Sequence, residues 1–282
     1  MRDKIKLYLE LMRFHKPVGI YLLLWPTLCA LWISAKGIPQ IKNILIYVLG
    51  VVVMRAAGCV INDFADYRFD SQVKRTCTRP LVTQKITTRE SIFLFLFLCL
   101  IAFILVLFTN KLTILIAFFA LLTAIIYPLM KRFTYWPQLV LGIAFSFSIP
   151  MAFATEGKSL SLTTGLLMLA TILWTIAYDT EYAMADREDD QKIGIKSTAI
   201  LFGQHDRWII GLFQGATTIA LIMIGVLQSF TWIYFTTIFI AILLFLFQQK
   251  LIMMRDPALC LKAFVNNQWV GLVIFLGIAL GY

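Results

Sequence analysis

The chain has 282 residues, of which 60% are hydrophobic and only 14% are charged. Soluble globular proteins are about 45–50% apolar and about 25% charged, so this composition excludes an ordinary soluble domain and a disordered chain. The formal net charge of +10 does not indicate nucleic-acid binding. The basic residues stand in short segments between long apolar runs, as they do in the loops of a membrane protein.

Nine apolar runs are long enough to cross a bilayer as helices, which need about 20 mostly apolar residues. Strands of a membrane barrel would be about half as long and would alternate polar with apolar side chains, which these runs do not do. The expected spans are residues 18–35, 43–61, 91–109, 112–130, 138–155, 160–178, 209–227, 230–247 and 263–282. The sequence therefore predicts an all-α, multi-pass membrane protein that forms a single domain over residues 1–282.

The basic residues also predict the orientation of the spans. Outside the spans, 20 Lys and Arg residues lie on the side of the N-terminus and 4 on the other side. Basic loops stay in the cytoplasm, so we expect a cytoplasmic N-terminus. Spans two and six point the same way and each ends in an acidic cluster, which indicates two parallel four-helix units followed by a ninth helix.

The two acidic clusters open the longest cytoplasmic loops, which we expect at about residues 62–90 and 179–208. If each helix continues into its cluster, the acids of that cluster share one face and repel one another. Mg²⁺ would offset this repulsion, because it prefers carboxylate oxygens and the C-terminal end of a helix favours cations. A solvated charge run is the weaker interpretation for two similar clusters. The residues that share a face are Asn62, Asp66 and Asp70, with Asp63 close to it, in the first cluster and Asp179, Asp186 and Asp190 in the second.

Basic residues follow each cluster and add an anion-binding character to this surface. They could contact lipid headgroups, or they could bind a diphosphate beside metal-bound acids. These bases are Arg68, Lys74, Arg75, Arg79, Arg187, Lys192 and Lys196, of which Lys74, Arg79 and Lys196 are the predicted substrate-binding residues. Arg55 lies inside the second span, seven residues before Asn62. A charge at this depth indicates either a functional site or a structural pair with an acid, and both interpretations stay open.

The residues around both clusters resemble the UbiA-type intramembrane aromatic prenyltransferases. The segment MRAAGCVINDFADYRFD resembles the first family motif, NDxxDxxxD, and YDTEYAMADREDDQKIGIKSTAILFGQ resembles the second. LLLWPTLCALW, YPLMKRFTYWPQLVLG, SIPMAFA and KAFVNNQWVGLVIFLG extend the likeness over nearly the whole chain. The likeness is strongest to the branch that acts on 4-hydroxybenzoate in bacterial ubiquinone biosynthesis. Tyr67 and Gln84 depart from the residues usual in that branch.

The resemblance implies a Mg²⁺-dependent transfer of a polyprenyl group from its diphosphate to carbon 3 of 4-hydroxybenzoate, in the bacterial inner membrane. It implies metal ligands at Asn62, Asp66, Asp70, Asp186 and Asp190, with Asp63 and Asp179 adjacent to them. It also implies that Tyr127 and Lys131 contact the diphosphate and that Arg132 has a substrate role. Because a buried carboxylate needs a cationic partner, we expect Arg132 to bind the acceptor carboxylate, with Arg55 as the second candidate. The residues expected to carry the chemistry are Asp66, Asp70, Asp186, Asp190 and Arg132.

Two other functions are considered beside this one. A family member acting on a naphthoate or on haem would share both acidic motifs, and only the flanking likeness favours 4-hydroxybenzoate. A cation-coupled transporter would also combine intramembrane charges with helical repeats, but its acids would be expected near the middle of the bilayer. These acids lie at the ends of the spans.

Reporter fusions can test the predicted topology. A fusion after Lys111 and a fusion after Asp206 are separated by an odd number of spans, so the two reporters should lie on opposite sides of the membrane. Reporters on one side would contradict the topology and remove the reason for placing both acidic clusters on the same surface.

Overall fold

The computed structural model describes residues 2–73 and 75–282, and the side chains from residue 4 onward within them. Over these residues the chain is built from α-helices and two short 3₁₀ helices. In chain order they are α1 (Arg2–Leu11), α2 (Val18–Ala35), α3 (Ile41–Asp70), α4 (Thr88–Leu107), α5 (Lys111–Phe133), α6 (Pro137–Ser146), α7 (Ser148–Thr155), α8 (Leu162–Lys192), α9 (Thr198–Phe202), η1 (Gly203–His205), α10 (Asp206–Leu227), α11 (Trp232–Leu251), η2 (Ile252–Met254) and α12 (Pro257–Gly281).

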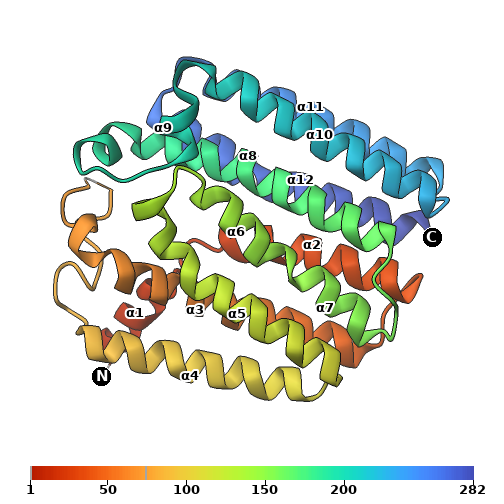
Figure 1. Cartoon of the computed structure of the whole chain (residues 1–282), viewed down its shortest axis with the longest axis horizontal. Coiled ribbons are helices and arrows are strands. Elements are labelled where there is room, and N and C mark those ends of the chain that lie inside the picture. Colours follow the sequence, from red (N-terminus) through yellow and green to blue (C-terminus); the bar gives the residue numbers. More distant parts are fainter. Residues whose placement is uncertain (1, 74) are drawn as a thin grey trace.

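The expected all-helical membrane architecture is confirmed. In the described part of the chain, nine helical stretches are long and apolar enough to cross a membrane, with α6 and α7 forming one of them and α9 to α10 another. Figure 1 shows the long helices running side by side, with the N-terminus and the C-terminus at opposite ends of the bundle. The cytoplasmic position of the N-terminus and the two parallel four-helix units stay predictions.

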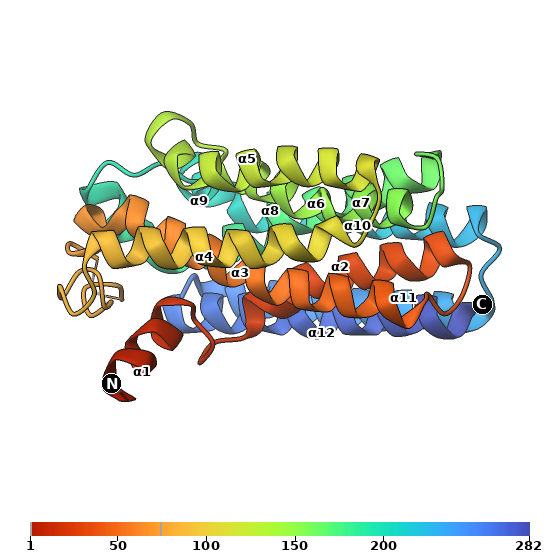
Figure 2. The same cartoon turned by 90° about the horizontal axis from the view of Figure 1, so that it is seen from below.

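Two helices extend well beyond the apolar runs that predict them. Helix α3 continues to Asp70 and α8 continues to Lys192, so both acidic clusters lie on helices and not in loops. The connecting segments shrink to residues 71–87 after α3 and 193–197 after α8. The N-terminal segment also forms a helix, α1, which projects from the bundle near the 71–87 segment (Figure 2). These polar extensions lie at one end of the molecule, which we call the polar end.

The fifth span is interrupted, and a proline accounts for the break. Helix α6 ends at Ser146 and α7 begins at Ser148. Pro150 has no N–H to donate to the carbonyl of Ser146, so the regular helical bond pattern cannot run through this point. Pro26 and Pro128 lie inside α2 and α5 without ending them.

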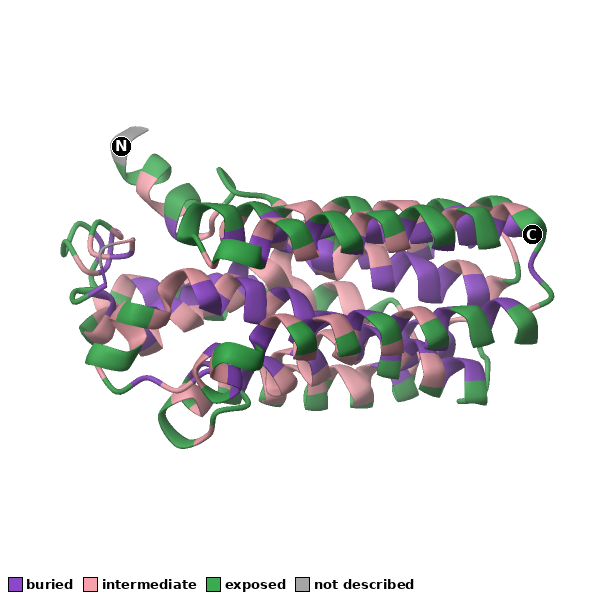
Figure 3. Cartoon of the chain, turned by 90° about the horizontal axis from the view of Figure 1, so that it is seen from above, coloured by how far each residue is buried: buried purple, intermediate pink, exposed green. Residues whose placement is uncertain are grey.

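Burial follows the pattern of a helix bundle surrounded by lipid. Figure 3 shows exposed residues along the outer faces of the long helices and buried residues on their inner faces. A polar network inside the bundle holds α8 in place. Asn267 of α12 accepts a hydrogen bond from Trp174 Nε1 at 2.8 Å and donates to Glu181 Oε2 at 2.9 Å. This network fixes α8 to α12 through Glu181, on the side of α8 away from Asp179, Asp186 and Asp190.

A glycine in α12 permits this packing, and its substitution gives a test of the fold. A Cβ atom at Gly271 would lie 2.5 Å from Trp25 Cδ1 and 2.8 Å from Trp174 Cη2. Gly271→Ala should therefore destabilise the protein by about 1–3 kcal/mol, which is typical of overpacking. Thermal unfolding in detergent would measure the change. Gly215→Ala is the matched control, because a Cβ there meets nothing within 4 Å. Equal stability of the two variants would contradict the packing.

Candidate functional site

A cavity of about 1070 Å³ lies between the helices that carry the two acidic clusters. At the polar end it is lined by the acids of α3 and α8 and by basic residues of the 71–87 segment. Further along the helices its walls are apolar and come from α2 to α7. Examples of these apolar wall residues are Val51, Phe103, Ile114, Phe118 and Met151. The cavity is therefore polar at one end and hydrocarbon-like along its length.

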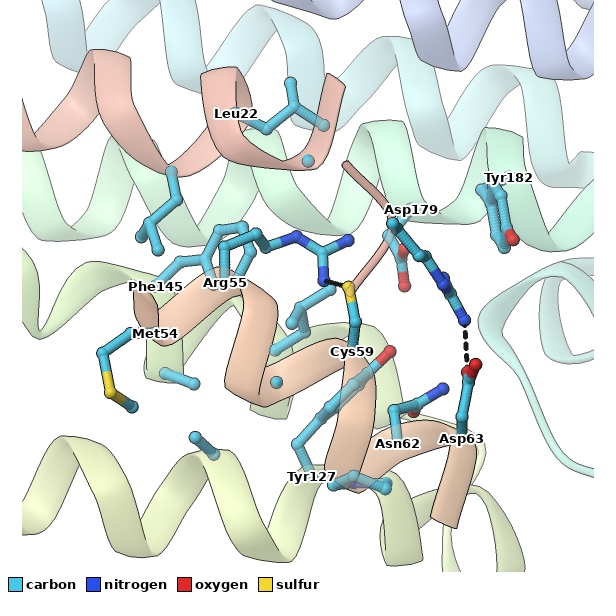
Figure 4. Close-up of a pocket in the computed structure, with 18 of the residues that line it drawn as sticks. Leu22, Met54, Arg55, Cys59, Asn62, Asp63, Tyr127, Phe145, Asp179 and Tyr182 are labelled. Carbon is cyan, nitrogen blue, oxygen red and sulfur yellow. Dashed lines mark hydrogen bonds and ion pairs between the residues drawn. The ribbon is translucent and has the colours of Figure 1, made fainter. Parts of the chain in front are cut away.

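The first acidic cluster faces this cavity as the helical spacing predicts. Asn62, Asp63, Asp66 and Asp70 all line it, and the three aspartates are buried. They reach this position because α3 stays helical through Asp70, which brings residues four apart onto one face. Figure 4 shows Asn62 and Asp63 projecting from the same stretch of α3.

The second cluster divides between two faces of α8. Asp179, Asp186 and Asp190 line the cavity. Glu181 is fully buried on the other side, where it accepts hydrogen bonds from Asn267 and from Gln214, the latter at 3.4 Å. The sequence thus predicts correctly which acids of α8 share the face of the first cluster.

Basic side chains pair with most of these carboxylates. Arg79 Nη1 lies 2.9 Å from Asp63 Oδ1 and 2.6 Å from Asp70 Oδ2. Lys131, at the end of α5, forms an ion pair with Asp66. The predicted substrate-binding residues Arg79 and Lys131 are thus brought into the cavity, where they offset the negative charge of α3.

Two further arginines enter the site that were not among the predicted site residues. Arg75 Nε donates to Asp186 Oδ1 at 2.9 Å and a second nitrogen contacts the other carboxylate oxygen, a two-pronged arrangement. Burial alone would lower the pKa of Arg75. The charges of Tyr182 and Asp186 and the hydrogen bond to Asp186 outweigh this effect, so the pKa lies above its ordinary value. Arg13 Nη2 lies 2.5 Å from Asp63 Oδ1. Arg75 lies among the bases of the first loop, whereas no sequence motif indicates Arg13.

Arg55 projects into the cavity from α3 without an acidic partner within ion-pair distance among the described residues. Its Nη1 contacts Cys59 Sγ at 2.8 Å. Its Nε is buried and has no hydrogen-bond partner among the described residues. Figure 4 shows Arg55, Tyr127 and Asp179 directed toward the same space. A Cβ at Gly19 of α2 would lie 2.3 Å from Arg55 Nε, so the guanidinium packs directly against a helix backbone. The lack of an acidic partner among the described residues favours the functional interpretation over the structural pair, because a half-buried cation at the cavity with an unused donor suits an anionic ligand.

The remaining predicted residues separate into those inside the cavity and those outside it. Tyr127 and Lys196 line the cavity, and Lys196 Nζ donates to the carbonyl of Phe133 at 3.2 Å. Arg132 is exposed outside the cavity, where it donates to the Ala65 carbonyl at 2.5 Å. The structure does not bring Arg132 to the other site residues. Lys74 lies outside the described residues.

The oxygen-rich end of the cavity fits Mg²⁺ without forming a complete cage. Within the described chain, no three Asp, Glu, His or Cys side chains are placed to hold a metal ion. Mg²⁺ does not need such a cage, because it keeps several waters and usually binds one or two carboxylates together with substrate phosphates. Asp66 Oδ1 is buried and has no hydrogen-bond partner among the described residues, so an anionic ligand atom is available.

Comparison with known families identifies the chain. The model of the UbiA prenyltransferase family matches residues 23–276, which include both acidic motifs and nearly all the spans. The chain belongs to the UbiA prenyltransferase family. The resemblance seen in the sequence is therefore confirmed.

Curated relatives within the UbiA family are similar over their full length. The chain is 53% identical over 281 residues to the 4-hydroxybenzoate octaprenyltransferase of Enterobacter sp. (strain 638), covering 100% of this chain and 97% of the relative. It is 52% identical to the protein of the same name from Klebsiella pneumoniae, covering 100% of this chain and 98% of that one.

Solved structures share the fold. The apo structure of a UbiA homolog from Aeropyrum pernix K1 superposes with a TM-score of 0.81 at 24% identity, over 93% of this chain and 97% of that one. A UbiA homolog from Archaeoglobus fulgidus bound to GPP and Mg²⁺ gives a TM-score of 0.73 at 18% identity, over 97% of this chain and 99% of the other. At these identities the likeness supports the fold alone.

Proposed function

We propose that this UbiA protein transfers a polyprenyl group from polyprenyl diphosphate to carbon 3 of 4-hydroxybenzoate and releases diphosphate, as a step of ubiquinone biosynthesis. The observation that carries the proposal is a single cavity with acids and bases at one end and apolar walls along its length. The full-length relatives named 4-hydroxybenzoate octaprenyltransferase support the choice of acceptor over a naphthoate or haem. We place the protein in the bacterial inner membrane, with the polar end in the cytoplasm.

The polar end suits a metal–diphosphate group. Carboxylates of both helices would hold Mg²⁺, with Asp66 and Asp70 from α3 and Asp186 and Asp190 from α8, and Asn62 beside them. The ion would neutralise charge on the leaving diphosphate. Arg79, Lys131 and Arg75 now pair with these acids. Once the acids bind metal, the same bases are free to donate hydrogen bonds to diphosphate oxygens, together with Tyr127 and Lys196.

The apolar length suits the prenyl chain and its cation. Breaking the allylic carbon–oxygen bond leaves the electron pair on the diphosphate and a carbocation on the prenyl chain. Phe103, Ile114 and Phe118 line the cavity beyond the acids, and such walls keep water from the cation. The ring carbon ortho to the phenol oxygen then forms the new carbon–carbon bond. Its proton passes to a carboxylate of the cavity, which acts as the general base.

The acceptor carboxylate needs a cationic partner, because a buried unpaired carboxylate is costly. The sequence favours Arg132 for this role with Arg55 as the second candidate. We now propose Arg55, since it lines the cavity and its buried Nε has no hydrogen-bond partner within the described residues. Arg132 lies outside the cavity and is already bound to a backbone carbonyl.

Substitution of one acid from each helix tests the metal–diphosphate site. Asp66→Asn and Asp186→Asn keep the shape of the side chain but remove the charge that binds Mg²⁺. Each should abolish turnover, or raise the Mg²⁺ requirement sharply, while the protein still accumulates in the membrane. Prenylation of labelled 4-hydroxybenzoate at several Mg²⁺ concentrations would measure both the turnover and the Mg²⁺ requirement. Glu188→Gln is the control, an exposed acid of α8 that does not line the cavity. Near-normal activity of both variants at limiting Mg²⁺ would sink the proposed site.

A pair of arginine variants tests acceptor recognition. Arg55→Lys keeps the charge but loses the planar fork that binds a carboxylate through two hydrogen bonds. Losing a charged hydrogen bond costs about 1.5–3 kcal/mol, so KM for 4-hydroxybenzoate should rise roughly ten- to a hundredfold. KM for polyprenyl diphosphate should change less. Arg132→Lys should raise the KM for 4-hydroxybenzoate less than Arg55→Lys does. The reverse order would indicate that Arg132, and not Arg55, binds the acceptor carboxylate.

A further inference from the structure

Arg13 occupies a backbone position that normally belongs to glycine. It follows α1, where Arg13 N donates to the Glu10 carbonyl at 2.9 Å and Phe14 N donates to the Leu9 carbonyl at 3.1 Å. This bond pair is the helix-ending motif in which one residue adopts a left-handed conformation. Arg13 has φ +58°. Glycine is usual there because a Cβ is strained at positive φ, and this position carries an arginine side chain instead.

The position of α1 does not depend on the Arg13 side chain. Leu11 is fully buried and belongs to the same apolar cluster as Val60 of α3 and Ile86 of the connecting segment. This packing fixes the end of α1 against the polar end of the bundle. The Arg13 guanidinium is therefore not needed as an anchor for the helix.

The guanidinium instead reaches a chain of charges inside the cavity. Arg13 Nη2 and Arg79 Nη1 contact the same oxygen, Asp63 Oδ1, at 2.5 and 2.9 Å. Arg79 Nη1 also contacts Asp70 Oδ2 at 2.6 Å. All four residues line the cavity, and Asp63 is only 2% exposed. Two arginines thus share one buried aspartate, and the second of them also contacts Asp70, another acid that lines the cavity.

We propose that Arg13 is a positioning residue for the diphosphate of the prenyl donor, acting through Asp63 on Arg79. This inference rests on the proposed function. Asp63 serves as the anchor of two arginines and not as a metal ligand. Arg13 offsets part of the negative charge of Asp63. When Asp70 binds a metal ion instead of Arg79, the positive charge of Arg79 is therefore still available to a diphosphate. Arg13 itself needs no contact with the substrate.

Arg13→Gly separates this role from helix capping. Glycine fits the left-handed backbone at least as well as arginine, so the unfolding temperature should not fall. The KM for polyprenyl diphosphate should rise tenfold or more, while the KM for 4-hydroxybenzoate stays within twofold. Arg13→Lys retains the charge and should restore part of the loss. Asp63→Asn should show the same donor defect, and the double variant should be no worse than Arg13→Gly alone, since both act in one relay.

Arg255→Gly is the matched control. Arg255 also has a left-handed backbone, with φ +55°, and it also holds a buried aspartate, with its Nη2 2.8 Å from Asp206 Oδ1. Neither residue lines the cavity, and Arg187 still pairs with Asp206 in the variant. The donor KM of Arg255→Gly should match that of the unmodified protein.

Binding of inorganic diphosphate provides a second measurement that needs no turnover. With Mg²⁺ present, inorganic diphosphate should raise the unfolding temperature of the unmodified protein, because a ligand that binds only the folded state stabilises it. The shift should be much smaller for Arg13→Gly. If Arg13→Gly shows the full shift and a donor KM within twofold of normal, the proposal is wrong and Arg13 only ends a helix. Failure of the unmodified protein to prenylate 4-hydroxybenzoate would contradict the proposed function, and the diphosphate shifts would still decide the role of Arg13.

Discussion

The balance of charge at one end of a membrane-embedded bundle is the constraint on which this structure depends. Carboxylates facing one cavity repel each other strongly where little water screens them. Asp63, Asp66, Asp70 and Asp186 each have a basic partner. Those partners come from three separate parts of the chain: the turn after α1, the 71–87 segment and the end of α5. The charges of these segments offset those of the acids, which allows the two helices to carry several acids that face one cavity.

The same balance explains how the site can bind substrate without a preformed metal cage. In the proposed mechanism, each ion pair is exchanged for two other pairs, acid with metal and base with diphosphate. Exchanging one set of partners for another keeps every buried charge paired, which avoids the cost of exposing or isolating one. Arg55 takes no part in these pairs, because it has no acidic partner within ion-pair distance among the described residues. A site for two anionic substrates needs one cation that is not committed to the first.

The sequence predicts the parts of the structure that depend on local pattern. Nine apolar runs predict nine spans, and a spacing of three to four residues predicts which acids of α3 and α8 meet in one cavity. It does not predict that α3 continues to Asp70 and α8 to Lys192, because the partners that offset their charges are distant in sequence. It favours Arg132 beside Lys131, although adjacent residues of a helix point about 100° apart, so only one of the two can face the cavity directly. Lys131 therefore enters the cavity while Arg132 turns away from it.

Arg13 shows why some functional residues escape sequence reasoning and how a structure reveals them. Taken alone, it is one of several N-terminal bases that membrane orientation explains. Its role becomes visible only when a backbone that favours glycine and a contact with Asp63 are seen together. Residues that break a local rule without a local benefit are expected at functional sites. Arg255 breaks the same rule outside the cavity, where it helps neutralise the buried Asp206. At both positions an arginine with a left-handed backbone supplies a cation to a buried carboxylate, and only the location of that carboxylate separates the proposed substrate site from a structural joint.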